Sequence, residues 1–282
     1  MPRAEVVAAH LTHHGEGAVW WPDGHLRLVD GYAGDLVDLL PDGSVRRTHV
    51  GGFAGCFRPR QGGGAVIGAD RGFALLDADG TVHPPTVVLP PDVRMNDGTC
   101  DPEGNFWCGS MAWDGREGAG SVHRLDERGE VTLALQDATV ANGMSWSPDG
   151  ATVFWNDTPT QTVWQFDWAW DAGLVDRRPF VRIDPDRGGP DGLTVDRTGA
   201  VWVALWGGHA VHRYTPDGRL DTVVEVDAGQ VSSCTIGGAD LDTLYITTSR
   251  EDLADGEDPM AGSVFALGLG ESLGLLPLPY SG

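Results

Sequence analysis

Four residues with oxygen-bearing side chains recur at one spacing along the chain. Each lies eight residues before the glycine of a turn. These residues are Glu16, Asn96, Asn142 and Asp191. Carboxylate and carboxamide oxygens are hard donors, which suit cations such as Ca²⁺, Mg²⁺ or Mn²⁺. Because two members are neutral amides, a ring built from all four avoids the repulsion of four buried anions.

The same residues have a second interpretation as plain turns. Asx-Gly pairs commonly form turns, and glycine directly follows Glu16, Asn142 and Asp191. However, glutamate is a poor turn former, and the chain has only four asparagines beside 31 aspartates. Two of those asparagines nevertheless share this spacing. A metal ring and structural turns both stay open at this point.

Short strands and tight turns must position these side chains. Asp-Gly or related pairs recur along the chain between short apolar or alternating runs, which is the signature of β-hairpins. Every second turn begins a new unit, and the leading glycines lie at positions 24, 104, 150 and 199. Further units are expected to turn near residues 62–64 and 239–242. The result is six units of about 47 residues, the size of a four-stranded blade. The sequence therefore predicts an all-β, six-bladed β-propeller with residues 1–282 as a single domain.

Composition excludes several classes of function. The net charge is −22, and all 19 basic residues are arginine. Without lysine there is no Schiff-base amine and no P-loop. The strong negative charge disfavours nucleic acid and anionic membranes as partners. Residues 1–20 show no signal-peptide pattern, so we expect a cytoplasmic location. The four cysteines lack CxxC spacing and are expected to be free thiols.

Several strings resemble one family in their order and spacing. They run through almost the whole chain: His14-Gly15-Glu16-Gly17, Arg94-Met95-Asn96-Asp97-Gly98, Asn142-Gly143-Met144-Ser145-Trp146, Pro190-Asp191-Gly192-Leu193 and Ser232-Ser233-Cys234-Thr235. On these strings the chain is similar to the family of senescence marker protein (regucalcin), gluconolactonase and luciferin-regenerating enzyme. That resemblance implies a six-bladed propeller with one divalent cation in its channel, and hydrolysis of sugar lactones.

The resemblance also implies residue roles. Glu16, Asn142 and Asp191 match the family's metal ligands, and Asp191 matches its general base. Arg94 and Asn96 match a substrate-binding pair. Asp114 stands where the family usually has a substrate-binding glutamate, and this shorter side chain puts the sugar preference in doubt. We expect Ca²⁺, with Zn²⁺, Mn²⁺, Mg²⁺ or Fe²⁺ as alternatives.

The predicted function is therefore a metal-dependent sugar lactonase that opens an aldonolactone to the aldonic acid. Two alternatives remain: hydrolysis of another ester or a phosphotriester at the same site, or a non-enzymatic calcium-binding propeller. A serine hydrolase is disfavoured because no serine stands in a Gly-x-Ser-x-Gly elbow. The expected partner is a small sugar lactone, with no nucleic acid and no membrane. We expect a monomer or weak homo-oligomer.

Further residues are weaker candidates for the site. Trp113 could stack on a sugar face, and the last unit's serines and threonine could contact substrate. Loop histidines are usually solvated, so a ligand role is disfavoured for them. These candidates are Trp113, Ser232, Ser233, Thr235, His13, His14 and His209.

Overall fold

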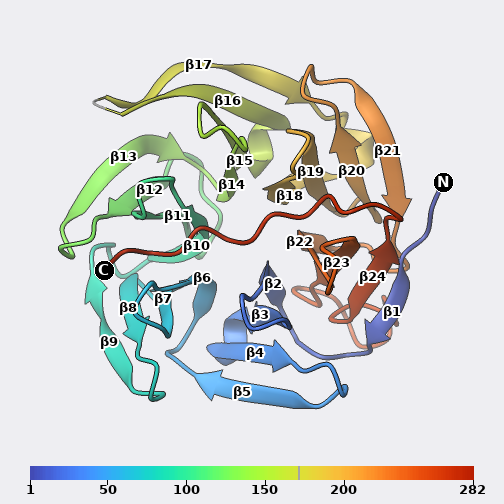
Figure 1. The fold of residues 1–282 in the computed structure, drawn as a ribbon, viewed down its shortest axis with the longest axis horizontal. Helices are drawn as coiled ribbons and strands as arrows, with labels where there is room; N and C mark the ends of the chain where they lie inside the picture. The colour runs from blue at the N-terminus through green and yellow to red at the C-terminus, as the bar shows by residue number, and fades with distance from the viewer. Residues whose placement is uncertain (171) are drawn as a thin grey trace.

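The computed structural model describes residues 1–170 and 172–282. In this part of the chain, 24 strands form six four-stranded sheets. Figure 1 shows the sheets standing around a common centre like the blades of a propeller. The helical segments described are 3-10 turns: η1 (Gly31–Ala33), η2 (Thr158–Thr160) and η3 (Pro185–Arg187). The predicted all-β, six-bladed propeller is confirmed.

Five blades follow the chain order from the centre outward (Figure 1). The first contains β2 (Gly15–Trp20), β3 (Leu26–Asp30), β4 (Asp35–Leu39) and β5 (Val45–His49). The second contains β6 (Ala54–Pro59), β7 (Ala65–Ala69), β8 (Gly72–Leu76) and β9 (Val82–Val87). The third contains β10 (Val93–Cys100), β11 (Phe106–Ala112), β12 (Gly120–Leu125) and β13 (Val131–Ala138). The fourth contains β14 (Ala141–Trp146), β15 (Thr152–Asp157), β16 (Thr162–Ala169) and β17 (Gly173–Arg182). The fifth contains β18 (Gly189–Val195), β19 (Val201–Trp206), β20 (Ala210–Tyr214) and β21 (Leu220–Glu225).

The sixth blade joins the two ends of the chain. Its inner three strands are β22 (Val231–Gly237), β23 (Thr243–Thr248) and β24 (Val264–Gly268). Its outer strand is β1 (Glu5–Ala8), which pairs with β24 so that Glu5 faces Ala266. The first strand thereby covers an edge that would otherwise lie open, and it locks the ring. Turn spacing did not predict this closure.

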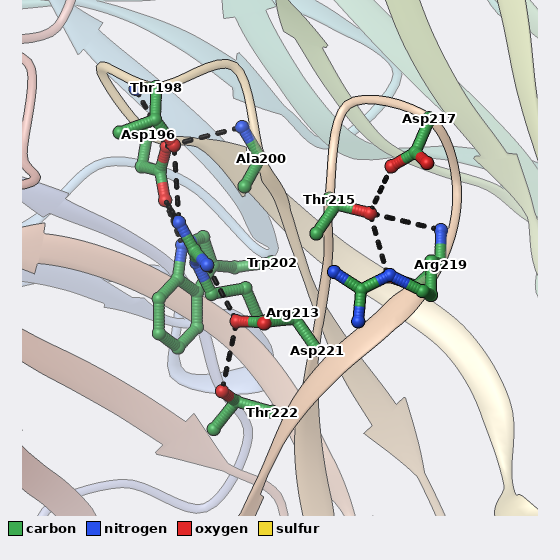
Figure 2. A network of polar contacts seen from close by, with 10 residues as sticks. All are labelled: Asp196, Thr198, Ala200, Trp202, Arg213, Thr215, Asp217, Arg219, Asp221 and Thr222. Atoms are coloured by element: carbon green, nitrogen blue, oxygen red, sulfur yellow. Dashed lines mark hydrogen bonds and ion pairs between the residues drawn. The ribbon is translucent and has the colours of Figure 1, made fainter.

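Buried aspartates hold the turns that end the inner strands. In the fifth blade, Asp196 accepts hydrogen bonds from Thr198 N at 2.8 Å, Ala200 N at 3.1 Å and Trp202 Nε1 at 2.9 Å. Arg213 completes the set with an ion pair of 2.9 Å, as Figure 2 shows. The side chain therefore ties the turn to the next strand and to the strand after it.

The third blade repeats the arrangement. Asp101 accepts from Asn105 N at 2.9 Å and from Trp107 Nε1 at 2.8 Å. In both blades the turn glycine has a positive φ, 83° at Gly104 and at Gly199, a conformation that glycine adopts without strain. The turns at two of the glycines that define the repeat, Gly104 and Gly199, thus have a physical basis in these bonds.

Apolar side chains fill the space between blades. Between the third and fourth blades, Trp107, Trp146 and Trp168 meet edge to face, with ring centroids 5.6–5.7 Å apart. Such pairs add about 0.5–1.5 kcal/mol beyond the burial of their area. This packing fixes the inner strands relative to one another, and therefore fixes the side chains they carry into the channel.

The C-terminal strap, residues 269–282, crosses one face of the ring (Figure 1). It bonds to turns at which inner strands end. Arg197 N donates to Leu273 O, Gln61 N to Tyr280 O and Ser281 N to Gly104 O, each at 2.9 Å. Strap residues 275–278 line a cavity of about 350 Å³ that reaches Asp97. The strap covers the channel mouth opposite to the strand starts.

No helix among the described residues combines the length and apolar character needed to cross a membrane.

Candidate functional site

A β-bulge interrupts each inner strand close to its start. The register shifts fall at Glu16–Val19, Ala54–Cys56, Met95–Gly98, Ala141–Met144, Pro190–Leu193 and Val231–Ser233. A bulge bends the strand and re-aims a side chain. Four of these bulges contain or begin at the residues that share one sequence spacing, namely Glu16, Asn96, Asn142 and Asp191. The repeat therefore places them at one mouth of the channel.

The glycines that follow these residues allow neighbouring inner strands to approach closely. A Cβ on Gly143 would lie 2.4 Å from Leu193 N, and one on Gly192 would lie 2.8 Å from Ser232 O. Both glycines lie inside strands, β14 and β18. The interpretation of these Asx-Gly pairs as turns is therefore wrong, because they serve strand packing beside the channel.

Two buried carboxylates lie close enough at this mouth for their charges to interact. Glu16 is 8% exposed and Asp191 is 3% exposed. Burial raises the pKa of Asp191 well above its usual value, and the charges of Glu16 and Asp97 raise it further. The pKa of Glu16 is also raised well above normal, first by burial and then by Asp97. Without a cation between them, these carboxylates destabilise one another.

Asn142 supplies a neutral oxygen beside them. Its Nδ2 donates to Thr158 Oγ1 at 3.1 Å, and Thr158 in turn donates to Pro190 O at 2.8 Å. This chain fixes the amide and leaves its oxygen without a hydrogen bond. Asn142 Oδ1 and Asp191 Oδ1 are both buried polar atoms without a partner.

These oxygens fit a divalent cation. Buried polar atoms are normally satisfied, so two unpartnered acceptors beside a repelling carboxylate call for a positive ligand. The donor set is Glu16, Asn142 and Asp191, which contains only two carboxylates. Among the described residues, no three His, Cys, Asp or Glu side chains make a metal-binding group by themselves. The amide is therefore essential to the proposed set.

Arg94 brings a buried positive charge to the same mouth. Its residue is 3% exposed, and its guanidinium lies over the rings of Phe53 at 4.2 Å and Trp113 at 5.4 Å. Burial lowers the pKa of Arg94. Among the described residues it forms no ion pair, and its Nε has no hydrogen-bond partner. Stacking positions the group and leaves donors for another molecule.

Asn96 holds Arg94 in place. Its Oδ1 accepts from Arg94 Nη1 at 2.6 Å, and its Nδ2 donates to Ala141 O at 3.1 Å. Both ends of the amide are therefore engaged within the protein. Contact between Asn96 and substrate stays a prediction, while its orienting role toward Arg94 is visible.

Trp113 and Asp114 lie at the rim. The Trp113 ring is 48% exposed and packs edge-on against Phe53 at 5.4 Å. The Asp114 carboxylate, at 65% side-chain exposure, is held by Arg116 Nη1 at 3.1 Å. The structure thus brings Trp113 against Arg94 and leaves Asp114 in solvent, so its substrate role stays a prediction.

Sequence reasoning missed three residues that act on this mouth, one of which, Asp97, lines the cavity under the strap. Asp97 is buried, and its carboxylate accepts from Gly98 N at 2.7 Å. Its position next to Asn96 was the available signal. Tyr32 and Glu251 come from loops of the first and sixth blades, and the tyrosine hydroxyl donates to the glutamate. No sequence spacing links those two residues.

Five of the weaker candidates fall into four places. His14 is buried at the mouth, 2.8 Å from Ser249 Oγ through its Nδ1. Ser232 Oγ donates to Gly15 O at 2.5 Å and so joins the sixth and first blades. Ser233 and Thr235 line the cavity under the strap. His209 lies in a separate hollow beside Arg187.

The family model described as the SMP-30/Gluconolactonase/LRE-like region matches residues 14–250. The chain belongs to this family. The predicted resemblance is confirmed, and the matched range contains every predicted site residue. The matched range runs from β2 to β23 and leaves out β1 and β24 of the sixth blade.

Two relatives carry the names of lactonases. The chain is 34% identical over 252 residues to the 6-deoxy-6-sulfogluconolactonase of Pseudomonas putida, covering 86% of each chain. It is 34% identical over 242 residues to the pentonolactonase XacC of Haloferax volcanii, covering 84% of this chain and 82% of that one.

A solved structure repeats the fold across nearly the whole chain. It is titled a calcium-binding protein, regucalcin, from Agrobacterium tumefaciens. The TM-score is 0.89 at 27% identity, covering 99% of this chain and 98% of that one.

Proposed function

We propose that the protein is a metal-dependent hydrolase that opens a sugar lactone to the aldonic acid. The observation that carries the proposal is the pair of buried, unpartnered oxygens on Asn142 and Asp191, together with the buried guanidinium of Arg94, which forms no ion pair among the described residues. Relatives named as lactonases support the reaction class.

Glu16, Asn142 and Asp191 would hold one divalent cation. When bound, such an ion supplies Lewis-acid stabilisation for negative charge that develops on the lactone carbonyl oxygen. Ca²⁺ is our first choice, because the donors are all oxygen and a structural neighbour is titled a calcium-binding protein. Zn²⁺, Mn²⁺, Mg²⁺ and Fe²⁺ are the alternatives that a metal panel would separate.

Asp191 acts as the general base in this proposal. The Asp191 carboxylate accepts a proton from the attacking water while the water oxygen bonds to the lactone carbonyl carbon. The bond from that carbon to the ring oxygen then breaks, and the ring oxygen takes up the proton as a hydroxyl. General-base assistance of this kind contributes about 10²–10⁴-fold to the rate.

Arg94 binds and orients the lactone. Its stacked guanidinium presents donors in a fixed plane, which suits ester and hydroxyl oxygens. Asn96 fixes the orientation of the guanidinium plane by accepting a hydrogen bond from Arg94 Nη1. Asp114 is proposed to reach sugar hydroxyls from the rim. Closely packed aromatic rings of Phe53 and Trp113 keep water away from the far side of the guanidinium.

Cation binding without turnover is the second candidate function, favoured by the printed description of the regucalcin neighbour. A panel of pentono- and hexonolactones, assayed with each metal in turn, separates the two. We expect at least one lactone to open faster than its spontaneous rate with added cation. If none opens with any metal while the cation still binds, the lactonase proposal is wrong and the binding function stands.

A further inference from the structure

Glu251 occupies a fixed position at the channel mouth. It follows β23 in the sixth blade, and its backbone N donates to Ser249 Oγ at 3.0 Å. Its backbone carbonyl accepts from Gln230 Nε2 at 3.0 Å. Hydrogen bonds therefore hold both the backbone N–H and the backbone C=O of Glu251. They fix the position from which its side chain extends.

The Glu251 carboxylate is held but not neutralised. Tyr32 donates its hydroxyl to one oxygen, and the other oxygen lies 3.6 Å from His14 Nδ1. No arginine among the described residues forms an ion pair with this carboxylate. Burial and Glu251 together raise the pKa of Tyr32 to about 12, which keeps the phenol a donor. The side chain is 23% exposed and so remains open to a ligand.

The field of Glu251 reaches the groups that would meet a substrate. The ring of its partner Tyr32 lies 5.6 Å from that of Phe53 and 6.3 Å from that of Trp113, the two rings that stack on Arg94. The charge of Glu251 favours the charged form of that arginine. Three carboxylates, those of Glu16, Asp191 and Glu251, therefore act on a mouth whose one buried guanidinium, among the described residues, belongs to Arg94. A bound divalent cation would offset Glu16 and Asp191, so the Glu251 charge would face only Arg94, whose donors are assigned to the lactone.

We infer that Glu251 is a specificity-determining residue that restricts the site to uncharged lactones and rejects lactones with a second, anionic group. This inference rests on the proposed lactonase function. A lactone is uncharged at its ester, whereas a sulfonate or carboxylate at the far end of the sugar would meet Glu251 or its neighbours. The same repulsion favours departure of the aldonate product, which is an anion.

The relatives differ in the charge of the lactones for which they are named, so their names do not decide whether this chain accepts an anionic lactone. One relative is named for a sulfonated gluconolactone, which is an anion, and another for pentonolactones, which are neutral. Arg94 is the only buried arginine at this mouth in the described chain, and its donors are assigned to the lactone itself. The described residues offer no second buried arginine at this mouth, and the exposed Arg116 at the rim is already paired with Asp92 and Asp114.

The test compares gluconolactone with the monolactone of glucaric acid, which adds a carboxylate at the far carbon. For the wild type we expect kcat/KM for the neutral lactone to exceed that for the anionic one by about tenfold or more, from like-charge repulsion. Glu251→Gln should raise kcat/KM for the anionic lactone about tenfold and leave the neutral one within about threefold. Glu251→Asp keeps the charge and should keep the discrimination.

Glu271→Gln is the matched control. It removes the same charge from an exposed position in the C-terminal strap, on the opposite face, and should leave the ratio unchanged. If Glu251→Gln fails to fold, the salt dependence of the wild-type enzyme still tests the inference. Added NaCl should raise kcat/KM for the anionic lactone and not for the neutral one, because salt screens the repulsion.

The outcomes separate the two proposals. Equal rates for both lactones in the wild type, or an unchanged ratio in folded Glu251→Gln, overturn the role of Glu251 and leave the lactonase function standing. A wild-type ratio of kcat/KM for the two lactones that does not change with salt overturns the role of Glu251 in the same way. Failure to open any lactone overturns the proposed function and, with it, this inference.

Discussion

Asp191 and Asp196 lie five residues apart in the fifth blade, and both are almost fully buried, at 3% and 0% exposure. Their surroundings are opposite. Asp196 sits in the turn after β18 and accepts hydrogen bonds from backbone amides, an indole and a guanidinium (Figure 2). Asp191 sits in a bulge of β18 and has an oxygen with no partner.

The pKa values follow from these surroundings. Burial alone would raise the pKa of Asp196, but bonds from Thr198, Trp202 and Arg213 outweigh it, and the pKa is lowered. For Asp191, burial and the charges of Glu16 and Asp97 act in the same direction, and the pKa is raised well above normal. Burial of a carboxylate therefore does not mark a functional site. A buried carboxylate with an unpartnered oxygen is a candidate for one, because its burial has to be compensated by a proton or by a positive ligand.

The largest expected effect is that of Asp191→Asn on turnover. We expect kcat for lactone opening to fall by about 10³-fold or more, since the general base is lost. The folded state should survive, because the substitution removes a repelling charge. Steady-state kinetics with saturating cation measure the first effect, and circular dichroism checks the fold. Normal turnover in the folded variant would remove Asp191 from the role of base.

Asp196→Asn should act on stability instead. The substitution replaces the charged acceptor of Arg213 and Trp202, so the free energy of unfolding should fall by about 2 kcal/mol. The kcat of the folded protein should match the wild type. Urea unfolding measures the free energy of unfolding, and steady-state kinetics measure kcat. The contrast between Asp191 and Asp196 is wrong if Asp196→Asn lowers kcat while the free energy of unfolding stays constant.

The pH dependence of stability should separate the two aspartates in cation-free protein. The pKa of Asp191 is raised in the folded chain, so its contribution falls as pH rises from about 4 through that raised pKa. The pKa of Asp196 is lowered, so its contribution is present above about pH 4 and is lost as pH falls through the folded pKa.

Urea unfolding in the presence of chelator, repeated from acidic to mildly alkaline pH, measures this difference. Asp191→Asn should gain stability over the wild type as pH rises, and Asp196→Asn should lose stability most above about pH 4. Parallel pH profiles for both variants would contradict the assignment of opposite surroundings.

The smallest expected effect is that of Asp114→Ala. The carboxylate is mostly exposed and already bound by Arg116, so its loss should change kcat/KM by at most about fivefold. Kinetics on the preferred lactone measure this change. A loss comparable to that of Asp191→Asn would mean that Asp114 closes over the substrate.

The inner strands and their polar residues could be predicted because both repeat. Turn glycines such as Gly104 and Gly199 need a positive φ, so their spacing reports the blade period directly. Glu16, Asn142 and Asp191 share one phase of that period, and the bulges aim them into the channel. Residues on loops do not recur at a fixed position of the repeat, so the spacing does not reveal them.

Glu251 illustrates what sequence spacing cannot reach. It lies 219 positions from Tyr32, and only closure of the ring brings the sixth blade beside the first. The strand β1 escaped prediction for the same reason, since its partner β24 lies at the other end of the chain. Asp97 was missed for another reason. It lies one residue after Asn96 and so does not share the repeated spacing, and the bulge between Met95 and Gly98 turns it toward the channel.

The central claim is that the unpartnered oxygens at the channel mouth hold one cation that lactone opening requires. The most direct test is a titration of chelator-stripped protein with Ca²⁺, in which the rate of lactone opening is followed at each addition. We predict a rate equal to the spontaneous one at the start, and full activity once one ion is bound per chain. Full activity in the stripped protein, or no activity at saturation with Ca²⁺ and each alternative metal, would contradict this account.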